Sequence, residues 1–152
     1  MNDLDINRTI YRYFVKDDLK QIAEIEKTSI NPPWSYNAIC EFSECETSRI
    51  LVAYNSEVIL GYITYSVVLD EVQIANVAVH SSFRRLGIAK NLLKTLYANS
   101  KANGMGIITL EVRESNEAAK RLYSRCGYIE AGRRKNYYKS PNEDAILMNL
   151  NL

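Results

Sequence analysis

The sequence predicts an α/β fold in which one mixed sheet of about seven strands carries helices on both faces. Three observations lead to this prediction. Stretches with strand-like and helical hydrophobic periods follow one another in the order β-α-α-β-β-β-α-β-α-β-β. Two of the expected strands, 74–79 and 107–112, are joined by a helical crossover, which makes them parallel neighbours. The 152 residues suffice for one buried core, so we expect a single domain over residues 1–152.

The composition is that of a globular protein, with 47% apolar and 24% charged residues. A formal net charge of +1 gives no reason to expect nucleic acid or an anionic membrane as a partner. No apolar run approaches the roughly 20 residues that span a bilayer, and residues 1–6 lack the pattern of a signal peptide. The three cysteines, Cys40, Cys45 and Cys126, form no CxxC pair, which argues against a disulfide framework or a zinc site. We expect a cytoplasmic protein that uses no metal.

The N-terminal half predicts one strand, two helices and a three-stranded antiparallel meander. Asp17 is a suitable N-cap for a helix that runs to about Thr28. Residues 31–35, which contain two prolines, end that helix, and Ser35 can cap a second helix to about Glu44. The expected strands are 11–15, 50–54, 58–68 and 74–79, with turns at 55–56 and 70–71.

The C-terminal half predicts two helices, each followed by strands. The first helix opens at residues 86–89 and is stopped by Asn103-Gly104. Strand 107–112 is apolar except for Thr109 and Glu111, which suits a central strand buried on both faces. Ser115 or Asn116 caps the next helix, which Gly127 ends, and residues 128–138 and 145–150 form closing strands.

The stretch from Asn76 to Ala89 forms a candidate anion site of strand, short loop and helix start. The first N–H groups of a helix have no partner within the helix, and the helix dipole favours negative charge there. Gly87 and Ala89 keep the approach clear of side chains, so a pyrophosphate could lie against the backbone. Arg84 and Arg85 add positive charge.

This stretch resembles the acetyl-CoA signature of the GNAT acetyltransferases, which is Gln or Arg, two residues, Gly, one residue, then Gly or Ala. The element order also matches that family over essentially the whole chain. In GNAT proteins the two parallel strands splay apart and the pantetheine arm of acetyl-CoA lies in the gap. A backbone N–H there, of Val77 or Ala78, would polarise the thioester carbonyl. The resemblance implies that acetyl-CoA is bound by Val77, Ala78, Val79, Arg84, Arg85, Leu86, Gly87, Ile88, Ala89, Asn116 and Tyr123.

Several further stretches resemble one GNAT branch, the RimI-type protein N-terminal acetyltransferases. That branch modifies the α-amino group of ribosomal small-subunit protein eighteen, so the resemblance implies a basic peptide beginning with Ala as acceptor. Tyr128, where Phe is commoner, and Ala89, in place of a second Gly, are mild departures. The matching pieces are Pro33-Trp34-Ser35, Leu69-Asp70-Glu71, Asn76 to His80, Leu110-Glu111-Val112-Arg113, Ser115-Asn116, Leu122-Tyr123, Gly127-Tyr128, Arg134-Lys135-Asn136-Tyr137-Tyr138 and Asp144-Ala145.

Acyl transfer from a thioester to an amine needs a neutral amine, a donor for the oxyanion and a proton for the departing thiolate. Near pH 7.4 roughly a quarter of α-amino groups are already neutral, so a carboxylate acting through water suffices as base. The resemblance assigns this role to Glu111, whose expected place at the end of a buried strand would raise its pKa by desolvation. The alternative is a strand-end carboxylate paired with Arg113 or Arg134.

The phenol of Tyr123, with an ordinary pKa of about 10, can protonate the thiolate, and the resemblance points to this tyrosine. An ordinary buried tyrosine is the alternative, since the chain has 11 of them. Trp34, Tyr137 and Tyr138 would wall the acceptor side, although exposed tyrosines on a closing hairpin are equally possible. His80, the one histidine of the sequence, sits at the mouth of the phosphate loop and away from the acyl end.

The sequence thus predicts direct transfer of acetyl from acetyl-CoA to a protein N-terminus in a ternary complex, since no cysteine occupies a matched catalytic position. One alternative keeps the fold and changes the acceptor to lysine, a polyamine or another small amine. A second is an acetyl-CoA-binding subunit without catalysis, because RimI-type proteins resemble parts of assemblies with tRNA-modification proteins. Binding of a nucleotide by a Walker-type loop is excluded because no Gly-Lys-Ser/Thr follows the loop.

Overall fold

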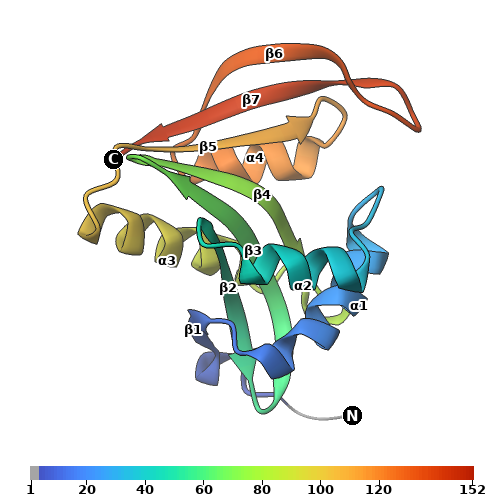
Figure 1. Cartoon of the computed structure of the whole chain (residues 1–152), viewed down its shortest axis with the longest axis vertical. Coiled ribbons are helices and arrows are strands. Elements are labelled where there is room, and N and C mark those ends of the chain that lie inside the picture. The colour runs from blue at the N-terminus through green and yellow to red at the C-terminus, as the bar shows by residue number, and fades with distance from the viewer. Residues whose placement is uncertain (1–3) are drawn as a thin grey trace.

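The computed structural model describes residues 4–152, which build one mixed sheet between two pairs of helices (Figure 1). The helices are α1 (Leu19–Ser29), α2 (Tyr36–Glu44), α3 (Ile88–Ala102) and α4 (Glu117–Arg125), with short 3-10 turns at Ile6–Arg8, Lys16–Asp18 and Ser81–Phe83. The strands are β1 (Ile10–Tyr13), β2 (Ser48–Asn55), β3 (Val58–Val68), β4 (Glu71–Val79), β5 (Ile107–Arg113), β6 (Ile129–Tyr138) and β7 (Glu143–Asn151).

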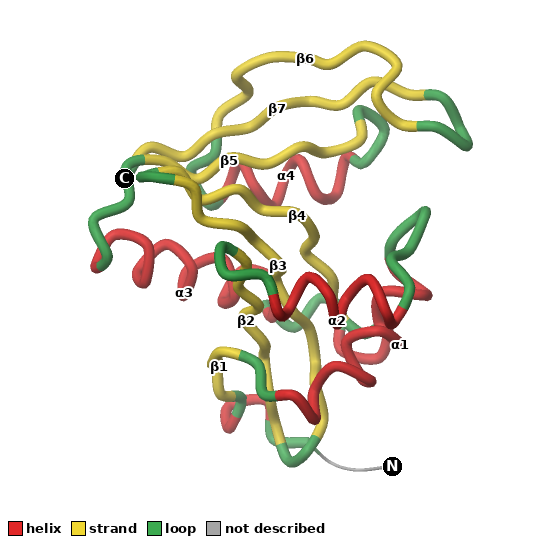
Figure 2. Tube along the Cα trace, in the orientation of Figure 1, coloured by secondary structure: helices red, strands yellow, loops and turns green. Residues whose placement is uncertain are grey.

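The strands lie in the order β1-β2-β3-β4-β5-β7-β6. Neighbours pair antiparallel except β4 and β5, which pair parallel across the α3 crossover. The predicted fold class and element order are therefore confirmed. In Figure 2 the meander β1 to β4 and the group β5-β7-β6 meet near the C-terminus and then separate.

Each face of the sheet carries its own apolar cluster, because successive strand residues point to opposite faces. On one face α1 and α2 pack against β2 and β3, with Ile22, Ile39 and Tyr62 at the centre. On the other face α3 and α4 pack against the central strands of the sheet, with Leu92 of α3 and Ile108 of β5 in the same cluster. Burying a side chain of this size contributes about 2 kcal/mol, so the two clusters fix the sheet between its helices.

The parallel strands β4 and β5 separate after three paired residues, which leaves a gap between them. Glu71, Val72 and Gln73 of β4 pair with residues 107–109 of β5, and no pairing follows. On its other side β4 stays paired with β3 up to Val79, so β5 is the strand that turns away. The splay predicted from the sequence resemblance is present, and it leaves one edge of β4 without a partner strand.

A β-bulge marks the point where the splay begins. Thr64 of β3 faces Asn76, whereas Tyr65 faces Ile74, so Ala75 is the extra residue on β4. A bulge bends its strand and turns the following side chains to new directions. Asn76 is the first residue that this bend redirects.

Two sequence predictions about local structure are wrong. Asp17 does not cap α1, because a 3-10 turn at Lys16–Asp18 precedes the helix and puts Asp18 at its N-cap. The Asp18 carboxylate accepts hydrogen bonds from Arg12 Nη1 at 2.7 Å and from the Val15 N–H at 2.8 Å, which holds that turn. Strand β5 is not buried on both faces, because its burial alternates and the face with Thr109 and Glu111 is only half-buried.

The other boundaries differ from the predicted ones by a few residues. Strand β4 begins at Glu71, three residues before the predicted start, because its first residues form the pairing with β5. The first hairpin turn is at Ser56-Glu57, where both residues have positive φ. The Ser35 cap is confirmed, since its hydroxyl accepts from the Ala38 N–H at 3.1 Å. Of the residues 1–6 considered for a signal peptide, 1–3 lie outside the described part of the chain.

Among the helices of residues 4–152, none combines the length and the apolar character needed to cross a bilayer. The same residues contain no group of three or more His, Cys, Asp or Glu side chains arranged to hold a metal ion.

Candidate active site

The unpaired edge of β4 presents backbone groups of Val77 and Val79 to the splay. The His80 N–H donates to the Leu60 carbonyl of β3 at 2.8 Å, and the Asn76 N–H donates to Thr64 Oγ1 at 3.1 Å. Because backbone groups alternate along a strand, Val77 and Val79 face the opposite, open edge. Ala78 faces β3 instead, so of the two N–H groups considered for the thioester carbonyl, that of Val77 faces the gap.

The loop that follows β4 leads into the N-terminus of α3. Gly87 is the N-cap of α3 at φ +79°, and a Cβ at this position would have no atom within 4 Å. Arg85 also has positive φ, at +63°. These left-handed residues turn the chain so that the first N–H groups of a 15-residue helix face outward. The site expected for a pyrophosphate therefore has open space above its glycine.

The side chains of this loop take different directions. Arg84 Nε donates to the Val79 carbonyl at 3.2 Å and Arg84 Nη2 to Ser29 Oγ at 3.2 Å, so this guanidinium closes the end of the open edge. Leu86 is exposed, Ile88 is buried in the core beneath α3, and Ala89 is half-buried beside it. His80 accepts from the Ser82 N–H through Nδ1 at 3.0 Å, which gives it a structural role in the turn.

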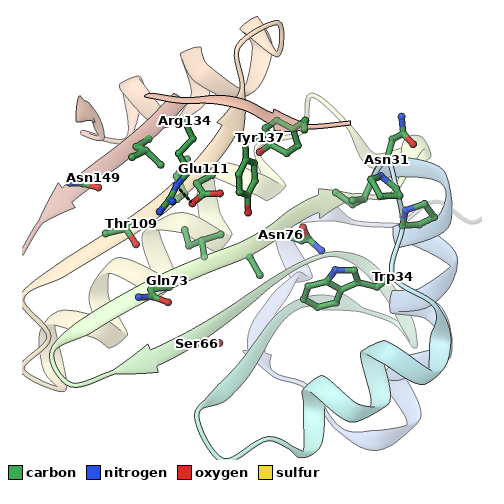
Figure 3. Close-up of a pocket in the computed structure, with 18 of the residues that line it drawn as sticks. Asn31, Trp34, Ser66, Gln73, Asn76, Thr109, Glu111, Arg134, Tyr137 and Asn149 are labelled. Carbon is green, nitrogen blue, oxygen red and sulfur yellow. Dashed lines mark ion pairs between the residues drawn. The ribbon is translucent and has the colours of Figure 1, made fainter. Parts of the chain in front are cut away.

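A groove of about 700 Å³ opens on the α1 and α2 side of the splay (Figure 3). Trp34, Tyr137 and Tyr138, the three aromatic residues predicted for the acceptor side, line it. Trp34 comes from the α1–α2 loop and packs against Phe42, with ring centroids 5.1 Å apart. The two tyrosines end β6 and pack edge to face at 5.1 Å. Aromatic walls from two separate segments thus face one another across the groove.

Glu111 lies on β5 and points into this groove beside Tyr137 (Figure 3). Its Oε1 is 3.0 Å from Nε of Arg134, and its side chain is 28% exposed. Interaction with the Glu111 carboxylate raises the pKa of the Tyr137 phenol. Of the two arginines considered as ion-pair partners, Arg134 is therefore the one that pairs with Glu111.

Arg113 is engaged elsewhere, and it ties the two walls of the groove together. Its guanidinium pairs with Glu143 at 3.3 Å and lies 4.3 Å from the centre of the Tyr138 ring. It also donates to the Asn31 carbonyl at 3.1 Å and to the Lys139 carbonyl at 3.4 Å. The α1–α2 loop and the β6–β7 turn are thus held at a fixed separation.

Tyr123 is buried on α4, on the face of the sheet opposite to α1 and α2. Its ring lies 5.8 Å from that of Tyr128. Burial raises the pKa of the Tyr123 phenol, with smaller contributions from Tyr138 and Cys126. The phenol therefore stays protonated at any ordinary pH, which a proton donor requires. Asn116 is the N-cap of α4, where its Oδ1 accepts from the Ala119 N–H at 3.1 Å.

Two residues of the groove received no role from the sequence. The sequence suggests Arg134 only as a possible ion-pair partner of Glu111, and Asn76 only as the first residue of the candidate anion site and of a matching stretch. For Arg134 the available signal was its positive charge, which could pair with the carboxylate of Glu111 at the end of the expected strand 107–112. For Asn76 the signal was a lone polar side chain in an otherwise apolar strand.

The Acetyltransferase (GNAT) family matches residues 16–128. This chain belongs to the GNAT acetyltransferase family. Among its relatives, the ribosomal protein bS18-alanine N-acetyltransferase of Escherichia coli is 35% identical over 135 residues, which are 88% of this chain and 90% of that protein. An uncharacterized N-acetyltransferase of Methanocaldococcus jannaschii is 38% identical over 141 residues, 91% of this chain and 89% of that protein.

Solved GNAT structures share the same fold. The crystal structure of the Escherichia coli ribosomal-protein-S18-alanine N-acetyltransferase superposes with a TM-score of 0.88 at 31% identity, covering 94% of this chain and 93% of that one. The complex of Arabidopsis thaliana NAA60 with acetyl-CoA superposes with a TM-score of 0.86 at 20% identity, covering 95% and 98%. The expected family resemblance is confirmed. None of these four names mentions a tRNA-modification protein, so that expected partnership has no support here.

Proposed function

We propose that this GNAT protein transfers the acetyl group of acetyl-CoA to the N-terminal α-amino group of a protein, and that ribosomal protein bS18 is the acceptor. The observation that carries the proposal is the position of Glu111. It lies in an aromatic-walled groove on one side of the sheet, at the splay whose open β4 edge suits a thioester donor. A base between a donor site and an acceptor site is what acyl transfer to an amine requires.

On the donor side, the backbone of Val77 and Val79 would pair with the pantetheine amides as an added strand would. The N-terminus of α3 would hold the pyrophosphate, and the open space at Gly87 would let it approach the backbone. Acetyl-CoA supplies the thioester. The Val77 N–H would donate to its carbonyl oxygen and stabilise the negative charge that develops there.

On the acceptor side, Glu111 would take a proton from the α-ammonium, directly or through a water. The amine lone pair then attacks the thioester carbon, so that a C–N bond forms and the C–S bond breaks. Tyr123 would give its proton to the departing thiolate, whose conjugate acid has a pKa of about 8.5. The attacking nitrogen, which is cationic once the C–N bond forms, would release its second proton to water, and the Tyr123 phenolate would regain a proton from water. The Arg134 guanidinium, 3.0 Å from Glu111, would have to yield its place to the ammonium. Both are cations, so the carboxylate exchanges one for the other.

The acceptor class is supported by chemistry and by relatives. An α-amine needs little help from a base, since its ordinary pKa of about 8 is far below the value of about 10.4 for lysine. The two walls of the groove, tied together by Arg113, suit an extended chain end between Trp34 and the tyrosines of β6. The named bS18-alanine N-acetyltransferases cover most of this chain at comparable length, which supports the ribosomal acceptor.

The test is to incubate the purified protein with acetyl-CoA and a peptide that carries the N-terminus of bS18 from the same source. Tandem mass spectrometry then maps the acetyl group. Label confined to the α-nitrogen supports the proposal. Label on lysine side chains of this peptide or of its α-blocked form would replace the acceptor class. Bound acetyl-CoA with no label on any amine would favour a binding role.

A further inference from the structure

A buried carboxylate lies beneath the groove and has no part in the mechanism above. Glu26 of α1 is 0% exposed. Its Oε1 accepts from the Tyr62 hydroxyl at 3.0 Å and from Asn76 Nδ2 at 2.9 Å. Within residues 4–152 its Oε2 has no hydrogen-bond partner. Burial raises the pKa of this carboxyl group, against the lowering effect of Tyr62, of Asn76 and of the nearby Trp34 backbone N–H. Burying the Glu26 carboxyl group costs desolvation free energy, so we expect it to have a role that offsets this cost.

The contact with Glu26 fixes the orientation of the Asn76 amide. Glu26 Oε1 is the acceptor in both of its hydrogen bonds, so the amide nitrogen of Asn76 faces it. The amide oxygen, Oδ1, then has the other direction, and Asn76 lines the groove. Among residues 4–152 the structure gives Oδ1 no donor. Asn76 therefore presents its amide oxygen, a hydrogen-bond acceptor, to whatever enters the groove.

The bulge at Ala75 and the splay put this acceptor opposite Glu111. Asn76 is on β4 three residues past Gln73, the last residue that pairs with β5, and Glu111 is on β5 two residues past its own last pairing. Figure 3 shows the two side chains entering the groove from the two diverging strands. The groove thus carries a carboxylate from β5 and an amide oxygen from β4.

We propose that Asn76 Oδ1 accepts a hydrogen bond from the acceptor amine and that Glu26 is the positioning residue that aims it. The proposal rests on the proposed function and adds the means by which the amine is oriented. A neutral primary amine has two N–H bonds and one lone pair. With one N–H toward Glu111 and the other toward Asn76, the lone pair points into the gap where the thioester would lie. The site then recognises a primary amine and discriminates against a secondary one, which has a single N–H.

The experiment compares two peptides that differ only in the first residue, one beginning with alanine and one with N-methylalanine. The measured quantity is the ratio of their kcat/KM values for α-nitrogen acetylation. Wild-type protein should prefer the primary amine by at least about tenfold, the value of one hydrogen bond to a charged or reacting group. Asn76→Leu, which keeps the branched shape of the side chain but removes the amide, should bring the ratio down by about the same factor.

Variants of Glu26 and of its partner Tyr62 separate an effect on the orientation of the Asn76 amide from an effect on the stability of the fold. Glu26→Leu removes the partner of Asn76 Nδ2 and should lower the ratio as Asn76→Leu does, whereas Glu26→Gln keeps an oxygen for both donors and should retain it. Tyr62→Phe removes the other hydrogen bond to Glu26 and should lower the urea midpoint while the ratio stays high. If Glu26→Leu does not fold, the ratio of kcat/KM values measured for Asn76→Leu is sufficient to test the proposal.

The outcomes distinguish the two proposals. If the wild-type protein labels neither peptide, the proposed function fails, and this inference fails with it. If the wild-type protein labels the alanine peptide and Asn76→Leu leaves the ratio unchanged, the function stands and the inference is overturned. A ratio that falls in Tyr62→Phe as far as in Asn76→Leu would also overturn it, because the effect would then follow stability.

Discussion

Arg134 Nε lies 3.0 Å from Glu111 Oε1, so the residue proposed as base is paired with a cation before an acceptor arrives. The arginine side chain is 57% exposed and the glutamate 28%. Ion pairs that are open to solvent contribute about 0 to 1 kcal/mol, so an ammonium ion can replace the guanidinium at little cost. The pair keeps the carboxylate oriented in the groove without making it unavailable.

Removing the carboxylate should slow the chemical step. In Glu111→Gln we expect kcat for the bS18 peptide to fall about 100-fold, the usual effect of losing one general base, with the KM for acetyl-CoA unchanged. The residual rate should rise with pH up to about 8, because the fraction of neutral α-amine then limits it. Glu114→Gln is the matched control, since Glu114 is on the same segment and pairs with Arg133 at 2.9 Å, outside the groove. Wild-type kcat in Glu111→Gln would remove the residue from the mechanism.

Removing the guanidinium should act on the acceptor. In Arg134→Gln the ammonium of the peptide no longer competes for Glu111, so we expect the KM for the peptide to fall severalfold and the KM for acetyl-CoA to stay the same. The free energy of unfolding should change by less than about 1 kcal/mol, as for other solvent-exposed pairs. Steady-state kinetics with each substrate varied in turn measure both constants. A higher peptide KM would mean that Arg134 binds the acceptor and does not compete with it.

Two neighbouring tyrosines offer a paired test of the proton donor. Tyr123→Phe removes the proposed acid, and we expect kcat to fall at least about tenfold. The Tyr128 hydroxyl is buried and has no hydrogen-bond partner within residues 4–152. Tyr128→Phe should therefore leave kcat near its wild-type value and stabilise the fold by about 1 kcal/mol, since an unpaired buried hydroxyl is lost. Equal losses of kcat in both variants would point to packing between the rings as the cause.

The sequence predicts those parts of the site that depend on local signals. The Ser35 cap, the glycine at the start of α3 and the order of the elements all follow from residue types within a few positions of each other. The alternation in β5 was also visible, because Thr109 and Glu111 are two residues apart and mark a half-exposed face. The prediction that β5 is buried on both faces gave too much weight to the apolar residues around Thr109 and Glu111.

The contacts across strands could not be predicted, because they depend on register. Strand β6 has register shifts between Glu130 and Gly132 and between Arg134 and Tyr138, and each shift changes which side chains face β7. The meeting of Arg134 with Glu111 follows from those irregularities. Asn76 likewise depends on the bulge at Ala75. Glu26 carried a signal, since it is four residues after Ile22 and so shares the buried face of α1.

Glycines at the two ends of α3 test the phosphate loop. Gly87 and Gly104 have φ of +79° and +74°, and a Cβ at either would have no atom within 4 Å. Valine at either position is therefore strained by the backbone alone, by about 1 to 2 kcal/mol. We expect Gly87→Val to weaken acetyl-CoA binding strongly in calorimetry and Gly104→Val to leave it unchanged, with similar losses of stability. Equal affinity in the two variants would refute the loop as the site of the pyrophosphate.

Buried tyrosines should make the fold sensitive to alkali. Burial is the first cause that raises the pKa values of Tyr62, Tyr65, Tyr123 and Tyr128. In the unfolded chain each phenol ionises near pH 10, so above that pH the unfolded state releases protons that the folded state keeps. These tyrosines should therefore leave the free energy of unfolding unchanged between about pH 7 and pH 9.5. Above it, each such tyrosine removes about 1.4 kcal/mol per pH unit until its own pKa in the folded state is reached.

Urea titrations at pH 8, 9.5 and 10.5 measure this effect, with the midpoint and the slope followed separately. Tyr128→Phe supplies the control, because one fewer phenol should make the decline above pH 10 shallower by the share of a single group. A midpoint that stays constant to pH 10.5 would mean that these phenols ionise in the folded protein as they do in water. Tyr123 could still act as a proton donor in that case, because a phenol with an ordinary pKa of about 10 is protonated at neutral pH.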